Sequence, residues 1–97
     1  MYKIIKVTDH GGNIKLEFME SLKSEHPEMN GYFLYPLHTA TRLCFIWADK
    51  SDKMMRTTLV KEYKEDNKVL KIKTENSIYT LEKINKDGGI CQNTDSR

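Results

Sequence analysis

The chain has 97 residues, of which 38% are hydrophobic and 31% are charged, a composition typical of one small globular domain and not of a disordered chain. Its longest apolar run, residues 43–48, is far shorter than the roughly 20 residues that a membrane-spanning helix needs, and lysines interrupt the first apolar residues where a signal peptide would have none. We therefore expect a cytoplasmic domain. A net charge of +2 is too small to predict a partner by itself.

The charge is unevenly distributed along the chain. Residues 50–86 carry 10 basic and 6 acidic side chains, whereas residues 1–49 carry 5 basic and 6 acidic ones. A basic second half can attract an anionic surface. Lysine is also the usual residue on exposed strand edges and outward faces, so the same excess fits a purely solubilising role.

The first eighteen residues predict two strands joined by a turn. Tyr2–Thr8 has the β-branched content of a strand, and Asp9–Asn13 contains two glycines that tolerate the positive φ of a hairpin turn. Ile14–Phe18 alternates apolar and polar residues with a period of two. This pattern predicts a second strand that pairs antiparallel with the first.

The next segment changes its pattern. Met19 and Leu22 are spaced for a helix, and Pro27 ends any helix at His26, so one or two helical turns are expected within residues 19–28. Tyr32–Leu37 is aromatic and apolar but contains Pro36, which indicates an edge strand or an irregular segment.

The second half of the chain predicts four strands joined by short polar turns. These runs are Arg42–Ala48, Met54–Tyr63, Lys68–Thr74 and Ser77–Ile84. The first of them is apolar on both faces, which predicts a central strand covered on both sides. In the third, Leu70, Ile72 and Thr74 share one face, and the lysines lie on the other.

The sequence thus predicts a mainly β fold. We expect a small bent antiparallel sheet or an SH3-like barrel of five to six strands, with one short helix between strands two and three. The alternative to closure is an open sheet with the helical insert packed on one face. We expect residues 1–85 to form the single domain, and residues 86–97, which contain a glycine pair followed by a polar run, to be a flexible tail.

The sequence contains no motif that points to catalysis or to a cofactor. Three histidines and two cysteines are present, but none has metal-ligand spacing: His10, His26, His38, Cys44 and Cys91. His10 in a glycine turn and His26 before a proline are expected to be exposed, and Cys44 to be a small buried hydrophobe. No GxSxG elbow or phosphate loop occurs. We expect no enzymatic activity, no catalytic residue, no metal and no cofactor.

Two kinds of binding surface remain. The first is an aromatic patch for a protein partner or for self-association, formed by Tyr32, Phe33 and Tyr35 unless these side chains plug the end of a barrel. The second is a single-stranded nucleic-acid surface, in which tyrosines stack on bases and basic residues contact phosphates. Its candidates are Arg56, Lys61, Tyr63, Lys71, Lys73 and Tyr79, with Trp47 as a further stacking residue.

Two stretches of the second half carry a resemblance. Residues 56–60 (Arg-Thr-Thr-Leu-Val) and 73–81 (Lys-Thr-Glu-Asn-Ser-Ile-Tyr-Thr-Leu) resemble a hairpin found in many short proteins of bacteria and their phages. The resemblance implies a β-hairpin and a bacterial or mobile-element origin, and it transfers no catalytic residue. Our first hypothesis is a non-enzymatic protein-interaction module of bacterial or phage type, and the alternative is a nucleic-acid-binding SH3/OB-like barrel.

Overall fold

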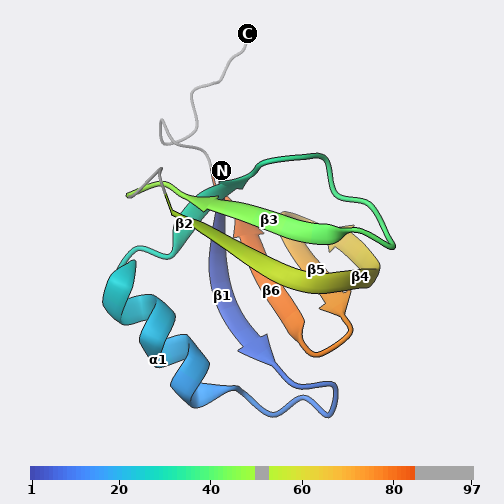
Figure 1. The fold of residues 1–97 in the computed structure, drawn as a ribbon, viewed down its shortest axis with the longest axis horizontal. Helices are drawn as coiled ribbons and strands as arrows, with labels where there is room; N and C mark the ends of the chain where they lie inside the picture. The colour runs from blue at the N-terminus through green and yellow to red at the C-terminus, as the bar shows by residue number, and fades with distance from the viewer. Residues whose placement is uncertain (50–52, 85–97) are drawn as a thin grey trace, which may run out of the picture.

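The structure is a computed structural model that describes residues 1–49 and 53–84. In these residues the fold is mainly β, with six antiparallel strands in one sheet and one short helix, α1, between β1 and β2 (Figure 1). The elements are β1 (Tyr2–Thr8), α1 (Leu16–Glu25), β2 (Asn30–Phe33), β3 (Arg42–Trp47), β4 (Met54–Asp66), β5 (Val69–Thr74) and β6 (Ile78–Lys83). The predicted fold class is confirmed, but the helix follows the first strand and not the second.

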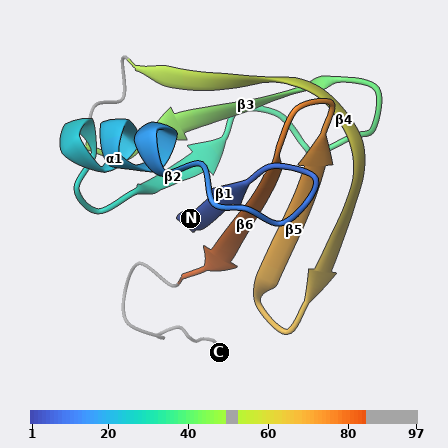
Figure 2. The same ribbon diagram turned by 90° about the horizontal axis from the view of Figure 1, so that it is seen from below.

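The sheet closes into a barrel-like ring. Each strand pairs with the next, and β1 also pairs with β6, so the predicted closure is confirmed over the open-sheet alternative (Figure 2). The two pairings of β1 differ in length: β6 aligns with it from Tyr2 to Thr8, whereas β2 aligns only with Tyr2 and Lys3. Beyond Lys3, the helix α1 lies beside β1, where Met19 and Leu22 pack on the core.

The predicted strand at Ile14–Phe18 is wrong. Ile14 makes one isolated bridge to Thr8, and α1 begins at Leu16. The alternating apolar residues of this segment do not line a buried face, because Leu16 is 65% exposed and Phe18 is 37% exposed. A spacing of three residues from Leu16 through Met19 to Leu22 fits a helix equally well, and packing on β1 selects the helix.

Segment 30–41 is more regular at its start than expected. β2 is a regular strand paired on both sides, and the irregular backbone begins at residue 34, before Pro36. Gly31 permits the close pairing with β3. A Cβ at this position would collide with the carbonyl oxygen of Ile46 and lie 2.6 Å from the ring of Phe45.

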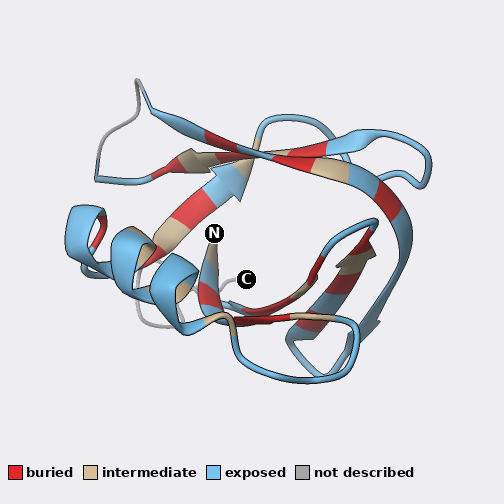
Figure 3. Cartoon of the chain, turned by 60° about the horizontal axis from the view of Figure 1, so that its bottom comes forward, coloured by how far each residue is buried: buried red, intermediate tan, exposed pale blue. Residues whose placement is uncertain are grey.

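The core fills the inside of the ring, and the strands alternate between buried and exposed residues (Figure 3). The predicted inward face of β5 is confirmed, with Leu70, Ile72 and Thr74 all buried. The buried hydrophobic residues are Ile4, Val7, Met29, Leu43, Phe45, Trp47, Met55, Val60, Leu70, Ile72, Tyr79 and Leu81.

The prediction that β3 would be covered on both faces is wrong. Leu43, Phe45 and Trp47 point into the ring and are buried, but Cys44 and Ile46 on the outer face are only half-buried. Cys44 is therefore not the fully buried residue that we expected. The outer face stays partly open because α1 packs beside β1 and not over β3.

The two ends of the ring lie side by side. The backbone N–H of Ile84 donates a hydrogen bond of 3.0 Å to the carbonyl oxygen of Met1. The predicted tail at residues 86–97 lies outside the described residues. Within residues 1–49 and 53–84, no helix has the length and apolar character needed to cross a membrane.

Candidate functional site

His26 is the one histidine that the fold buries, with 3% of its surface exposed. It ends α1, where its N–H donates to the carbonyl of Leu22 and its own carbonyl accepts from the N–H of Met29. The imidazole stacks on the indole of Trp47, with ring centroids 3.9 Å apart. The prediction that His26 is exposed is wrong. Pro27 restricts the backbone conformation of His26, but it does not indicate that Trp47 of β3 packs on the side chain.

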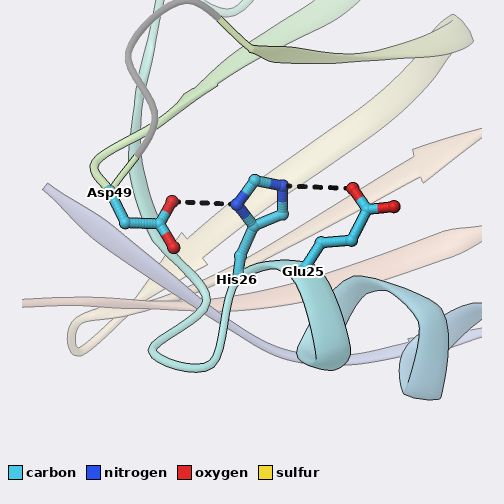
Figure 4. Close-up of polar contacts among 3 residues, drawn as sticks. All are labelled: Glu25, His26 and Asp49. Atoms are coloured by element: carbon cyan, nitrogen blue, oxygen red, sulfur yellow. Dashed lines mark hydrogen bonds and ion pairs between the residues drawn. The ribbon is translucent and has the colours of Figure 1, made fainter.

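Two carboxylates flank the imidazole (Figure 4). Nδ1 of His26 lies 2.8 Å from Oδ1 of Asp49, and Nε2 lies 3.9 Å from Oε1 of Glu25. The short contact makes Nδ1 the donor to Asp49, which fixes the ring orientation. In the described part of the chain, no serine, threonine or cysteine hydrogen-bonds this ring. The pair therefore joins the end of α1 to the residues that follow β3.

A metal site is not formed by these side chains. Among residues 1–49 and 53–84, no group of three or more His, Cys, Asp or Glu side chains is placed to hold a metal ion. His10 is exposed, and its Nε2 lies 2.8 Å from the carbonyl oxygen of Thr74, which ties the first loop to β5.

An apolar strip crosses the outer face of β2, β3 and β4. Tyr32 lies directly opposite Ile46, which lies directly opposite Met54. In the next row, Leu34 donates its N–H to the carbonyl of Cys44. Tyr32, Leu34 and Met54 are each 42% exposed. We define the apolar strip as Tyr32, Leu34, Cys44, Ile46 and Met54.

A small hollow adjoins the apolar strip at Cys44. It has a volume of about 140 Å³ and lies between the irregular segment after β2 and the first half of β3. We call it the anchor hollow; its lining residues are Tyr35, Pro36, Leu37, His38, Thr41, Arg42, Leu43 and Cys44. Its size suits one side chain of a bound partner.

The structure divides the predicted aromatic patch. Tyr32 lies in the apolar strip, and Tyr35, at 64% exposure, borders the anchor hollow. Phe33 points inward instead, with its ring centroid 4.7 Å from that of Tyr2. Sequence reasoning missed Ile46 and Met54, because only the strand register shows that they lie beside Tyr32.

The predicted nucleic-acid residues fall into separate places. Tyr63, Lys71 and Lys73 line one hollow of about 540 Å³, the β4–β5 hollow, together with Glu62, Lys64 and Ile78. Lys64 lies directly opposite Lys71, whereas Lys73 pairs with Glu62 at 3.9 Å. Like charges on directly opposed residues destabilise a sheet, so an anion at this position would relieve the repulsion.

The other candidates do not join that hollow. Lys61 is exposed at the irregularity between Val60 and Glu62. Arg56 lies on the first half of β4, and Trp47 and Tyr79 are buried. Burial raises the pKa of the Tyr79 hydroxyl, and a hydrogen bond with the Ser77 side chain opposes this shift. A buried ring has no free face on which a base could stack.

Comparisons of the chain with protein-family models, with curated proteins and with solved structures find no match. A function is therefore inferred from the surfaces of the fold itself.

Proposed function

We propose that this protein is a non-enzymatic protein-interaction module, which binds an apolar segment of a partner protein on the apolar strip. The observation that carries the proposal is the register of Tyr32, Ile46 and Met54 across three adjacent strands. Single exposed apolar residues are ordinary on protein surfaces, but adjacent ones on rigid strands form a contiguous contact area.

The anchor hollow supplies the specificity that a flat strip lacks. Protein interfaces draw most of their binding energy from a few side chains seated in pockets. A hollow of about 140 Å³ beside Cys44 accepts one aliphatic or small aromatic side chain of the partner, while the rest of the segment covers the strip.

Charge indicates the chemistry of the partner. Arg42 lines the anchor hollow, and Arg56 lies opposite Cys44 at the margin of the strip. None of the residues of the strip or of the hollow lining is an aspartate or a glutamate. The fitting partner is an apolar segment flanked by acidic residues. A second copy would bring further arginines to the same margin, which disfavours self-association.

The resemblance of residues 56–60 and 73–81 to a hairpin of short bacterial and phage proteins supports a bacterial or phage-type protein. Together with a small domain of ordinary charge, it supports a role in the cytoplasm.

The test is a selection from a random peptide library, followed by mapping of the selected peptides by amide chemical shifts. We expect peptides with an apolar side chain between acidic residues, which shift the amides of Tyr32, Ile46 and Met54. Ile46→Lys combined with Met54→Lys should weaken binding by more than about tenfold. Ile5→Lys, an exposed apolar residue of β1, is the matched control and should bind normally.

Three outcomes would contradict this proposal. Shifts that map away from the strip, or equal losses in the control, would show that another surface binds. Light scattering that finds a dimer, abolished by the two lysines at positions 46 and 54, would make the occupant a second copy.

Binding of single-stranded nucleic acid is the second candidate, favoured by the two directly opposed lysines, Lys64 and Lys71, beside Tyr63 in the β4–β5 hollow. It predicts that a random oligonucleotide binds with strong salt dependence. Lys71→Ala with Lys73→Ala should then reduce both affinity and salt slope. Lys3→Ala with Lys6→Ala removes two exposed lysines from β1 and should change neither. Equal losses in both pairs would indicate unspecific attraction.

A further inference from the structure

A third hollow, of about 320 Å³, lies where the start of α1, the first half of β4 and the β5–β6 turn meet. We call it the α1–β4 hollow. Its lining residues are Lys15, Phe18, Arg56, Thr57, Thr58, Asn76, Ser77 and Tyr79. It contains two cations and four hydroxyl groups, and none of its lining residues is acidic.

The two cationic side chains, Lys15 and Arg56, differ in their existing hydrogen bonds. Nζ of Lys15 donates to the carbonyl oxygen of Asn76 at 3.0 Å and to Oγ of Ser77 at 2.7 Å. Its third N–H has no acceptor among the residues that the structure describes. Arg56 is exposed and forms no hydrogen bond or ion pair with its side chain within the described residues. One cation is therefore fixed in place by the β5–β6 turn, and the other presents its full set of donors.

Hydroxyl groups form the floor of the hollow. Thr57, Ser77 and Tyr79 line it, and each is more than nine-tenths buried. Ser77 is held by its neighbours, because its N–H donates to Oγ1 of Thr74 and its Oγ accepts from Lys15. The Ser77 hydroxyl is thus positioned before any ligand arrives, so its ordering costs little on binding.

We propose that the α1–β4 hollow binds the phosphate group of a phosphate monoester. A phosphate monoester carries close to two negative charges and three strong acceptor oxygens. Arg56 offers a planar fork of donors and Lys15 a point charge. The hydroxyls add neutral donors, except that of Thr57, which already donates to the carbonyl oxygen of Thr58 at 2.7 Å. This donor set matches a phosphate better than a single carboxylate, which has two oxygens and one charge.

The organic part of the ligand has its own contact. Phe18 lines the same hollow and is 37% exposed, although it is a large apolar residue on a surface helix. An apolar or aromatic group attached to the phosphate can cover this ring and remove it from water. The site uses none of the five residues of the apolar strip, and the one residue it has in common with the peptide proposal is Arg56 at the margin of that strip.

The experiment is a titration followed by amide chemical shifts, at constant ionic strength, with inorganic phosphate, phenyl phosphate and benzoate. We expect saturable shifts at Lys15, Phe18, Asn76 and Ser77, with phenyl phosphate tighter than phosphate. Arg56→Gln should weaken phenyl phosphate by at least about tenfold. Lys6→Gln, which removes an exposed cation of β1, is the control and should leave binding unchanged.

Further variants separate the two parts of the site. Phe18→Ala should reduce the affinity for phenyl phosphate to that for inorganic phosphate. Arg56→Lys keeps the charge but not the fork and should bind between wild type and Arg56→Gln, which also guards against a misfolded glutamine variant. AMP and a phosphotyrosine dipeptide distinguish a nucleotide from a phosphorylated side chain, and saturable binding of either supports the site.

The proposal is overturned if phosphate shifts all lysine-rich surfaces without saturation, if Arg56→Gln binds as well as wild type, or if benzoate binds as tightly as phenyl phosphate. None of these results bears on the five residues of the apolar strip, which carry the peptide proposal and lie outside this hollow.

Discussion

The imidazole of His26 lies flat on the indole of Trp47, with an angle of 6° between the ring planes. This stack joins the C-terminal end of α1 to the last residue of β3. Asp49, two residues beyond Trp47, holds the same imidazole from its edge at 2.8 Å. The helix is thus attached to the sheet at its end by one buried residue, although none of the ten residues of α1 itself is fully buried.

Loss of the Asp49 carboxylate should destabilise the protein more than loss of the Glu25 carboxylate. Asp49→Ala leaves the buried Nδ1 of His26 without a partner, and we expect a loss of about 1–3 kcal/mol in the free energy of unfolding. Glu25 is 3.9 Å from Nε2 and its side chain is 70% exposed, so Glu25→Ala should cost less than about 0.5 kcal/mol. Urea denaturation measures both, and equal losses would contradict the assigned role of Asp49.

Gly31→Ala should be among the most damaging substitutions in the chain. The added methyl group collides with the backbone of β3 and with Phe45, neither of which can move without opening the ring. We expect a loss of about 3 kcal/mol or more, or no folding at all. Gly11→Ala is the matched control because its nearest contact, Oδ1 of Asp9, is at an ordinary 3.4 Å. Thermal denaturation of the two variants tests the closeness of β2 and β3.

Truncation of the adjacent residues Met54 and Met55 should change the stability of the protein by very different amounts. Met55 is buried at 9% exposure, and Met55→Ala is expected to cost about 2–4 kcal/mol. Met54 lies on the outer face at 42% exposure, and Met54→Ala should change stability by less than about 0.5 kcal/mol. If Met54→Ala proves as costly as Met55→Ala, the outer face of β4 is not open and the apolar strip is not available.

Tyr79 predicts a loss of stability at alkaline pH. Its pKa is raised above the ordinary value of 10.0, first of all by burial. Above pH 10 the unfolded chain releases this proton while the folded chain retains it, so the stabilising contribution is complete below that pH and is lost as the pH rises through the folded-state pKa. One proton contributes at most about 1.4 kcal/mol per pH unit.

Tyr79→Phe isolates this contribution from the lysines that titrate in the same range. The difference in unfolding free energy between wild type and Tyr79→Phe should stay constant up to about pH 10 and then shift in favour of the phenylalanine variant. Denaturant titrations at several pH values measure it. A difference that is independent of pH up to 11 would show that the Tyr79 hydroxyl is not buried.

The strands were predictable where a repeated pattern coincided with a real buried face. β5 shows this most clearly, because Leu70 and Ile72 alternate with lysines and the ring buries only the apolar side. Ile14–Phe18 had the same alternation without such a face, since the free side of β1 is taken by β2 and by α1. A period of two indicates a strand only if a partner strand is available, and that depends on the whole topology.

The surfaces were less predictable than the strands, because each depends on residues distant in sequence. Tyr32 was a candidate from its aromatic neighbourhood, but Ile46 and Met54 join it only through the register of β2, β3 and β4. Tyr63 and Lys71 come together for the same reason, whereas Arg56 and Tyr79 meet Lys15 in a different hollow. His26 depends on Trp47 and Asp49, which no local pattern connects to it.

The hydrogen bond between Ile84 and Met1 has a practical consequence. Since the first and last described residues of the ring are neighbours, the domain can be inserted into a surface loop of a host protein through two short linkers without stretching either junction. In such a chimera both linkers would leave the inserted domain from the same side, so the two loop ends of the host protein could stay close together.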